Sequence, residues 1–318
     1  MKQLFNRSFL FLAIVSILLV ITACGNDSSE SDKSGNKETE NTTRVVKDAN
    51  GDVTIPEKVD NIIAPYSEDA LLALGITPSH QWAIGDSVIE YLQPQLKDVP
   101  KIEWNLPVEQ VVNASPDLVI FSAPSAVPDG DLEPYKKVTT PFVLSEEDSK
   151  DWRKALKTIS KVVGKEDKAT EVLADYDKKA EEAKTAIHDA IGDETVAILW
   201  VIGDAYYLVE QDRHSGNVIY GDLGIKAPEF VASLPAAEPT WNPISLEKIA
   251  ELDADHIILA SKETETGLKT LQDSSVWKGL PAVKNGNVHI MNDTSNWTIT
   301  GLIANEKTID ETVEALTK

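Results

Sequence analysis

The chain has 318 residues and a formal net charge of −22 at pH 7, from 30 Lys or Arg and 52 Asp or Glu. No basic stretch is available to displace counterions from phosphates, so we expect no nucleic-acid partner. The chain is long enough for two lobes with separate cores, and its single cysteine gives the fold no disulfide to rely on.

The first 23 residues predict an export signal and not a part of the fold. Lys2 and Arg7 precede an apolar run from Phe9 to Ile21 that is short for a membrane span. The segment from Ile21 to Cys24 resembles the lipobox of bacterial lipoproteins, in which the Cys becomes the mature N-terminus and carries the acyl chains. Cys24 is therefore the predicted lipidation site. An ordinary signal peptide or a short anchor with an incidental Cys is the alternative.

The rest of the chain divides into four predicted segments. Gly25 to Asn41 contains no apolar residue, and residues 24–44 are expected to be the lipidated Cys and a disordered tether. An N-terminal lobe is predicted at 45–148, a connecting helical segment at 149–192 and a C-terminal lobe at 193–318.

An internal repeat predicts the architecture. Val108 to Ile120 matches Leu246 to Ile258 at a constant offset, and each copy is typical of a short helix, a tight turn and a buried strand. A Trp-Asn pair stands just upstream of each copy, at Trp104 and at Trp241, and each half contains an apolar helix that stops at Leu-Gly-Ile. The two halves are therefore expected to be similar α/β lobes.

A long amphipathic helix is predicted between the halves. Apolar residues recur every three or four positions from Ala169 to Ala190, and the pattern ends at Gly192. A helix from Glu166 to Ile191 would be about 39 Å long and could brace both lobes. Because a helix does not absorb backbone rotation without breaking its hydrogen bonds, we expect only modest closure of the lobes around a ligand.

Six segments predict strands, and helical patterns separate most of them. They are Asn61–Ala64, Asp117–Phe121, Phe142–Leu144, Thr195–Val201, His256–Leu259 and Val288–Met291. The alternation indicates a mainly parallel sheet with flanking helices in each lobe, and a ligand cleft between the lobes.

This arrangement resembles the siderophore, haem and cobalamin family of substrate-binding lipoproteins of ABC importers, in particular the ferric hydroxamate binders of Gram-positive bacteria. The likeness rests on the order and spacing of Ile62-Ile63-Ala64-Pro65 with Leu74-Gly75-Ile76, the Pro107–Ile120 block, Gly216–Tyr220 with Leu223-Gly224, and Val276–Leu280 followed by Val288-His289-Ile290. The resemblance implies a lipid-anchored protein on the outer face of the cell membrane that delivers a ferric siderophore to a permease and its ATPase subunit. We expect it to be a monomer without a cofactor of its own.

The same resemblance implies that a surface glutamate of each lobe docks on arginines of the permease. The repeated blocks place Glu109 and Glu247 at those positions. Pro107 suits the first turn of one helix and Ser245 the N-cap of the other. Stabilisation of each helix dipole by a first-turn acid is the alternative role of both glutamates.

Aromatic residues at strand ends and in loops are the predicted ligand contacts, since ligands of open α/β sheets bind beyond the carboxyl ends of the strands. They are Tyr66, Trp82, Trp104, Trp200, Trp241 and Trp297, and burial in the core is the alternative for each. Trp152 and Trp277 lie on helical patterns and are expected to be packing residues.

Arg213 and His214 are the predicted polar ligand contacts. They precede a helix start, where backbone N–H groups and a guanidinium could converge on ligand oxygens. The hydroxamate binders that the chain resembles carry a Trp and an Arg in this stretch. Here an Asp stands at the Trp position, and either Arg213 or His214 falls near the Arg position.

The five histidines show no spacing suited to a Zn or Mn cage, so we expect no metal site and a ligand that brings its own iron-coordinating oxygens. The acidic chain disfavours a highly anionic catecholate, which favours a hydroxamate or a mixed citrate-hydroxamate complex. Haem, with His214 or Tyr66 as an axial ligand, and cobalamin are the alternatives within the same importer class.

An enzyme is not expected, because the sequence has no Gly-x-Ser-x-Gly elbow, Walker loop, His-Glu-x-x-His or Gly-x-Gly-x-x-Gly motif. A purely structural surface lipoprotein is disfavoured by the duplication, since two similar lobes leave a cleft between them.

Overall fold

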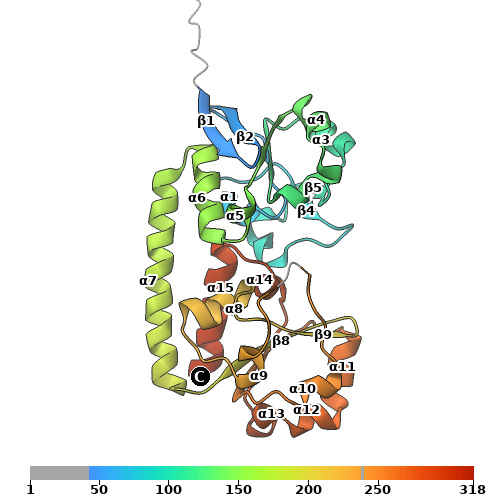
Figure 1. Ribbon diagram of the computed structural model, residues 1–318, viewed down its shortest axis with the longest axis vertical. Coiled ribbons are helices and arrows are strands. Elements are labelled where there is room, and N and C mark those ends of the chain that lie inside the picture. The colour runs from blue at the N-terminus through green and yellow to red at the C-terminus, as the bar shows by residue number, and fades with distance from the viewer. Residues whose placement is uncertain (1–42, 238–239) are drawn as a thin grey trace, which may run out of the picture. The chain divides into compact units, whose positions relative to one another are not determined.

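The computed structural model describes residues 43–237 and 240–318 (Figure 1). The predicted export signal and Cys24 lie outside the described residues. The described fold begins with strand β1 (Thr43–Asp48), which pairs antiparallel with β2 (Gly51–Pro56). The predicted tether was therefore too long by two residues. Arg44 belongs to the fold, because its guanidinium donates to the carbonyls of Val162 and Glu57.

The N-terminal lobe contains two small parallel sheets. One has the strand order β3-β6-β7, and the other pairs β4 with β5. The strands of these sheets are β3 (Ile62–Ile63), β4 (Gln81–Ala83), β5 (Lys101–Glu103), β6 (Leu118–Phe121) and β7 (Thr140–Val143). The helices of the N-terminal lobe are α1 (Glu68–Ala73), η1 (Glu90–Leu92), α2 (Gln93–Leu96), α3 (Val108–Ala114), η2 (Pro124–Ala126), η3 (Pro128–Gly130), α4 (Glu133–Lys136) and α5 (Glu146–Ser149). Every residue of β3 and β6 is buried, as expected of parallel strands that are covered on both faces.

The C-terminal lobe contains one sheet in the order β11-β10-β8-β9, in which only β9 is antiparallel to its neighbour. The strands are β8 (Val196–Ile202), β9 (Ala205–Leu208), β10 (His256–Ala260) and β11 (Val288–Met291), and the helices are α8 (His214–Gly216), η4 (Asn217–Asp222), α9 (Glu229–Ala232), α10 (Leu246–Ile249), α11 (Thr266–Asp273), α12 (Ser275–Gly279), α13 (Pro281–Asn285), α14 (Ser295–Thr298) and α15 (Leu302–Thr317). All six predicted strands are present, and the mainly parallel sheets are confirmed.

The internal repeat has the predicted structure in both halves. Helix α3 leads through Ser115, which is left-handed with φ 47°, into the buried strand β6, and α10 leads into β10. Gly75 and Gly224 have φ values of 78° and 65°, which confirms the predicted left-handed ends of the two Leu-Gly-Ile helices. The second of these helices is the π-helical turn η4.

The predicted connecting helix is α7 (Glu166–Ile191), with the predicted bounds. Its apolar stripe is buried from Ala169 to Ile187, whereas Ala190 is exposed, so the stripe ends one turn earlier than the pattern suggested. Helix α7 packs on α6 (Trp152–Val163), on η4 and along α15 (Figure 1).

A single hydrophobic cluster joins elements of both lobes with α7. It contains buried residues of β3, β6 and β7, of β8 and β10, and of α7 and α15. Because separating the lobes would expose part of this shared core to water, the packing favours limited motion between them.

Candidate functional site

The carboxyl ends of two neighbouring N-lobe strands open into a pocket of about 230 Å³. Tyr66 follows β3 and Ser122 follows β6, so parallel pairing brings the two residues to the same edge of the sheet. The lining residues carry no charge and are mostly apolar: Pro65, Tyr66, Trp104, Leu106, Ile120, Phe121, Ser122, Ala123, Ser125 and Ala126. We call this the N-lobe pocket. Its volume is below that of a typical small-molecule site, so a bulky ligand would need a second surface.

The two predicted aromatic contacts in this pocket are exposed to solvent. Tyr66 is 43% exposed and Trp104 is 47% exposed. Large aromatic side chains are usually more deeply buried in folded proteins. The Tyr66 ring lies 5.4 Å from the ring of Trp82 on β4, which stands behind it and is only partly exposed. Trp82 is therefore a support of Tyr66 in this structure.

A buried carboxyl lies beneath this aromatic pair. The Glu68 Oε1 accepts a hydrogen bond of 2.7 Å from the backbone N–H of Trp82, and Glu68 is only 1% exposed. Burial raises the pKa of Glu68 to about 7, because the ionised form would be held away from water.

Backbone strain gathers at the candidate site. Among the described residues, five non-glycine positions have positive φ. Two of them, Tyr66 and Leu106, line the N-lobe pocket, and a third is His214, the predicted ligand contact in the other lobe. Residues held in this unfavourable conformation cost of order 1–3 kcal/mol each and are concentrated at functional sites.

The C-terminal lobe presents a group of four rings that we call the aromatic cluster: Trp200, Tyr207, His214 and Trp241. Trp200 lies near the carboxyl end of β8, opposite the last residue of β10, and Tyr207 is its cross-strand partner on β9. The ring of Trp241 lies 4.9 Å from that of Trp200, 5.9 Å from that of Tyr207 and 5.8 Å from that of His214. All four side chains are partly exposed, so the cluster forms an apolar surface that a ligand can reach.

The two predicted polar residues differ in their surroundings. Arg213 is 5% exposed, its guanidinium is paired with Glu210 through bonds of 2.6 and 3.2 Å, and it lies 4.3 Å from the ring centre of Trp241. His214 is partly exposed, and burial together with the Arg213 charge lowers its pKa to about 4. The imidazole of His214 is therefore neutral near pH 7.

Trp297 stands apart from the other predicted aromatic contacts. It is completely buried, its indole N–H donates to the Glu311 carboxylate at 2.8 Å, and its carbonyl accepts from Ser215. Trp277 is buried as expected, whereas Trp152 is partly exposed and packs on Tyr176 of α7. The prediction that Trp297 touches ligand finds no support in this geometry, because no face of its ring is accessible.

Sequence reasoning missed three residues of the site. Tyr207 lies on a strand that was not predicted, although a Tyr-Tyr pair after Gly203-Asp204 is a signal of a hairpin strand. Glu210 stands three residues before Arg213, but the two residues lie in a turn and not in a helix, so their spacing alone did not indicate the ion pair. Ser122 follows a predicted strand, and only the pairing of β3 with β6 shows that it lies near Tyr66.

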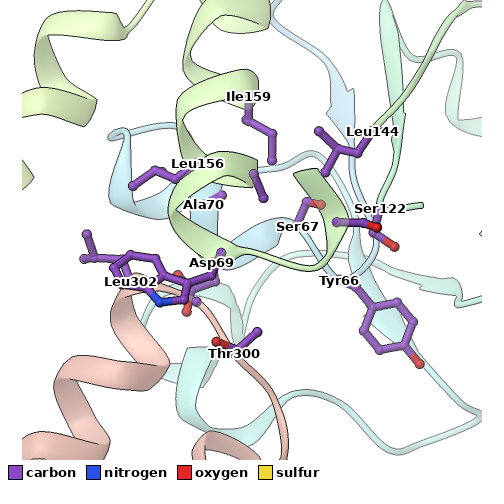
Figure 2. A pocket seen from close by; sticks show the side chains of 14 residues that line it. Tyr66, Ser67, Asp69, Ala70, Ser122, Leu144, Leu156, Ile159, Thr300 and Leu302 are labelled. Carbon is purple, nitrogen blue, oxygen red and sulfur yellow. The ribbon is translucent and has the colours of Figure 1, made fainter. Parts of the chain in front are cut away.

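The two lobes are joined beside the N-lobe pocket by a buried aspartate. Asp69 of α1 accepts hydrogen bonds from the backbone N–H groups of Ile303 and Ala304 in the first turn of α15, at 3.1 and 2.9 Å. Figure 2 shows Asp69 beside Leu302, while the ring of Tyr66 points away from Leu156 and Ile159. Asp69 is thus an N-terminal cap supplied from the other lobe.

The two predicted docking glutamates lie in equivalent places. Glu109 and Glu247 are exposed and occupy the first turns of α3 and α10. The Ser245 hydroxyl accepts from the Lys248 N–H, which confirms the predicted N-cap, whereas Pro107 is itself the N-cap residue of α3 and precedes the first turn. Hydrogen bonds to its own backbone N–H and to Ser245 lower the pKa of Glu247.

Among the residues that the structure describes, no cluster of three or more His, Cys, Asp or Glu could hold a metal ion. No helix of the described part of the chain is long and apolar enough to cross a membrane.

Comparison with known proteins identifies the class. Residues 64–294 match the family model described as periplasmic binding protein, which is more than half of the chain. The chain therefore belongs to the periplasmic binding protein family, a family of substrate-binding proteins.

Individual members of the family are similar to the chain over nearly its whole length. It is 31% identical to the iron(3+)-hydroxamate-binding protein FhuD of Bacillus subtilis, over 96% of this chain and 97% of that one. It is also 31% identical to the probable siderophore-binding lipoprotein YfiY of the same organism, over 95% and 94% of the two chains.

Solved structures share the fold. A binding-protein component of a Fep/Fec-like ferrichrome ABC transporter from Bacillus subtilis superposes with a TM-score of 0.71 at 28% identity, over 86% of this chain and 99% of that one. The triscatecholate siderophore binding protein FeuA of Bacillus subtilis gives a TM-score of 0.70 at 22% identity, over 86% and 98%. These likenesses show the two-lobed α/β fold with a long connecting helix.

Proposed function

We propose that this chain is the extracytoplasmic binding protein of an ABC importer and that it captures a ferric siderophore, with a hydroxamate or a mixed citrate-hydroxamate complex as the favoured ligand. The full-length similarity to binders of iron(3+)-hydroxamates supports the ligand class. The named relatives that are lipoproteins support an extracytoplasmic location.

The main support for the proposal is the presence of an aromatic surface near the carboxyl ends of the strands in each lobe, the N-lobe pocket in one and the aromatic cluster in the other. A ferric siderophore presents a saturated iron centre inside an organic shell, so its binder needs shape, aromatic contacts and a few hydrogen bonds, and no iron ligands of its own. The N-lobe pocket offers Tyr66, Trp104 and two serines, and the aromatic cluster offers four rings. In this proposal both surfaces enclose one ligand, and a small approach of the lobes completes the site.

Titration of the intrinsic tryptophan fluorescence tests the ligand class. The protein without its lipid is titrated with a ferric trihydroxamate, ferric citrate, a ferric tricatecholate, haem and cobalamin. Saturable submicromolar quenching by the trihydroxamate or by a citrate-containing complex is expected, because Trp104, Trp200 and Trp241 lie at the proposed surfaces. A response to haem or cobalamin alone would replace the siderophore assignment, and no response to any of them would refute it.

In the same proposal Cys24 carries the lipid that holds the protein at the outer face of the cell membrane. The lipobox-like sequence before Cys24 supports this assignment. A Cys24→Ala variant is expected to leave the cells and appear in the medium, whereas the wild type stays with the membrane fraction. Retention of the variant on the membrane would contradict lipid anchoring at this residue.

We further propose that the protein acts as a monomer that docks on its permease, and so on the attached ATPase subunit, through Glu109 and Glu247. Charge reversal of both residues to Lys is expected to abolish iron uptake while ligand affinity survives. Glu229→Lys is the matched control, because Glu229 is also an exposed acid in the first turn of a short helix. Normal uptake by the double variant, or equal loss in the control, would remove the docking role.

A further inference from the structure

We propose that Glu68 couples ligand binding to proton uptake: the ligand binds the form of the protein in which this buried carboxyl is protonated, so affinity falls as the pH rises. The coupling rests on the proposed function and adds a proton to it. Glu68 acts as a positioning residue for Tyr66 and Trp82 and does not itself touch the ligand.

Glu68 is connected to both aromatic residues at this end of the N-lobe pocket. It follows Tyr66 by two positions, in the first turn of α1, and its Oε1 accepts a hydrogen bond of 2.7 Å from the backbone N–H of Trp82. The rings of Tyr66 and Trp82 lie 5.4 Å apart, with 60° between their planes. Because Tyr66 lines the pocket, Glu68 holds residues that shape a predicted ligand surface.

The carboxyl of Glu68 is enclosed by protein. Glu68 is 1% exposed, and its Oε2 is buried and has no hydrogen-bond partner among the described residues. The neighbouring charge that acts on it is that of Asp69, which is also an acid. An ionised Glu68 would therefore be a buried charge beside a like charge, which is strongly unfavourable. Burial accordingly raises the pKa of Glu68 to about 7.

The titratable and charged groups around the Glu68–Asp69 pair are mostly acids. They are His80 next to β4, Glu90 and Tyr91 of η1, Asp293 before α14, and Glu306 and Lys307 of α15. His80 is neutral near pH 7, because burial lowers its pKa. The cations that reach these elements pair with other acids: Lys307 with Asp293 and Glu311, and Lys262 with Glu90. These surroundings favour the protonated form of Glu68.

The two protonation states of Glu68 affect the aromatic pair differently. A neutral carboxyl stays in its buried site with Tyr66 and Trp82 packed beside it, whereas an ionised carboxyl gains hydration only if water reaches Oε2. Tyr66 is the more exposed member of the pair and has a strained φ of 63°, so its displacement admits water and relieves that strain. A ligand that covers the Tyr66 ring holds the pair in place and excludes this water. It therefore binds the protonated form more tightly.

Linkage gives the sign and the size of the effect. Glu68 of the free protein is about half protonated at pH 7, because its pKa is about 7. If the ligand raises that pKa by about one unit, about 0.4 proton is taken up per ligand at pH 7, and affinity falls about fivefold between pH 6 and pH 8. His214 does not contribute in this range, since its pKa is about 4.

Isothermal titration calorimetry measures the proton uptake. Ferrichrome is the probe, because it is a ferric trihydroxamate without a group that titrates between pH 6 and pH 8. Titrations at pH 7 in phosphate, Hepes and Tris, which differ in ionisation enthalpy, give the number of protons as the slope of the observed enthalpy against the ionisation enthalpy. We expect a slope of about 0.4 for the wild type, and fluorescence titrations should show about fivefold weaker binding at pH 8 than at pH 6.

Glu68→Gln separates the proton from the shape of the side chain. The amide keeps the carbonyl acceptor for the Trp82 N–H and places an NH₂ group where the second oxygen stood, so it mimics the neutral carboxyl. Its slope should be within about 0.1 of zero, and its affinity should change less than about twofold between pH 6 and pH 8. Glu181→Gln is the matched control on the exposed face of α7 and should keep the wild-type slope.

A residue that served stability alone would leave the binding enthalpy independent of the buffer. An equal wild-type enthalpy in all three buffers therefore overturns the coupling, whether or not the variant folds, and leaves the proposed function intact as long as ferrichrome binds. A slope that Glu68→Gln retains overturns it as well, since another group would then carry the proton. Absence of ferrichrome binding at both pH 6 and pH 8 would contradict the favoured ligand class, and the coupling would fall with it.

Discussion

At the scale of the residue, the structure separates tryptophans that the sequence could not distinguish. Residue type and position near a strand end describe Trp241 and Trp297 equally well, yet Trp241 lies in a partly exposed group of rings and Trp297 is completely buried. Burial depends on residues distant in sequence, such as the Glu311 carboxylate that receives the indole N–H of Trp297. No local pattern contains that information.

This difference predicts opposite results for two substitutions. Trp241→Ala should lower ligand affinity at least tenfold, since ring contacts at the centre of a binding surface are worth about 2 kcal/mol or more. Trp297→Phe should leave affinity within about twofold and lower the free energy of unfolding by about 1–3 kcal/mol, because a buried hydrogen bond is lost. Titration and urea unfolding of both variants measure the two effects, and a loss of affinity in Trp297→Phe alone would reverse the assignment.

Glu68 predicts a dependence of stability on pH. Its pKa is raised from 4.5 to about 7 by burial, so between these values the native state keeps a proton that the unfolded state has released. The proton on Glu68 therefore contributes fully to the free energy of unfolding below pH 4.5, and this contribution is lost as the pH rises through 7. The total loss is roughly 2–4 kcal/mol. Glu68→Gln should remove this part of the pH dependence and make the protein more stable than the wild type at pH 8.

Urea unfolding of the wild type and of Glu68→Gln at pH 5 and pH 8 measures this effect. Glu181→Gln serves as the control, since Glu181 is exposed on α7. Equal pH dependence in the wild type and in Glu68→Gln would show that the carboxyl titrates normally, for example through contact with water.

At the scale of the element, the helices and strands that carry a strong local pattern were predicted best. The bounds of α7 were correct because an apolar stripe and a following glycine mark both its face and its end. The β1-β2 hairpin was missed, because no strand was predicted before Asn61 and the tether was extended to residue 44. Only the pairing of the two segments shows the hairpin. Strand β9 was also missed, although the Tyr-Tyr pair after Gly203-Asp204 is a hairpin signal. Its contact with Trp200 could not have been predicted, because the register of β9 on β8 places Tyr207 opposite Trp200.

No sequence pattern predicts the cap that Asp69 provides for α15. Asp69 is more than 230 positions away from Ile303 and Ala304, from whose N–H groups it accepts hydrogen bonds. Asp69→Ala should lower the free energy of unfolding by about 1–3 kcal/mol, since two buried N–H groups lose their acceptor. Asp69→Asn retains one acceptor and should cost less. Urea unfolding measures both, and equal stability of Asp69→Ala and the wild type would show that water replaces the carboxylate.

At the scale of the whole molecule, α7, the shared hydrophobic cluster and the Asp69 cap all oppose separation of the lobes. The sequence predicted the lobes and the connecting helix, because duplication and helical periodicity are patterns within the chain. It could not predict the cap or the shared core, which depend on contacts between the halves. We therefore expect only a small movement of the lobes on ligand binding.

Spin labels at Lys137→Cys in the N-terminal lobe and Lys284→Cys in the C-terminal lobe measure that movement, in a variant that lacks Cys24, the only natural cysteine. Both positions are exposed. The distance between the labels should change by less than about 5 Å when ligand is added, since the bracing helix absorbs little rotation. A change of about 10 Å or more would indicate a hinge and contradict the bracing role of α7.

In the proposed function, the N-lobe pocket and the aromatic cluster bind one ferric complex together. A crystal structure of the protein with a ferric trihydroxamate, with the iron located by its anomalous scattering, would show whether they do. We expect a single iron site whose organic shell contacts Tyr66 or Trp104 on one side and Trp241 on the other, without any protein ligand to the iron. An iron site elsewhere, or one coordinated by a side chain such as His214, would contradict it.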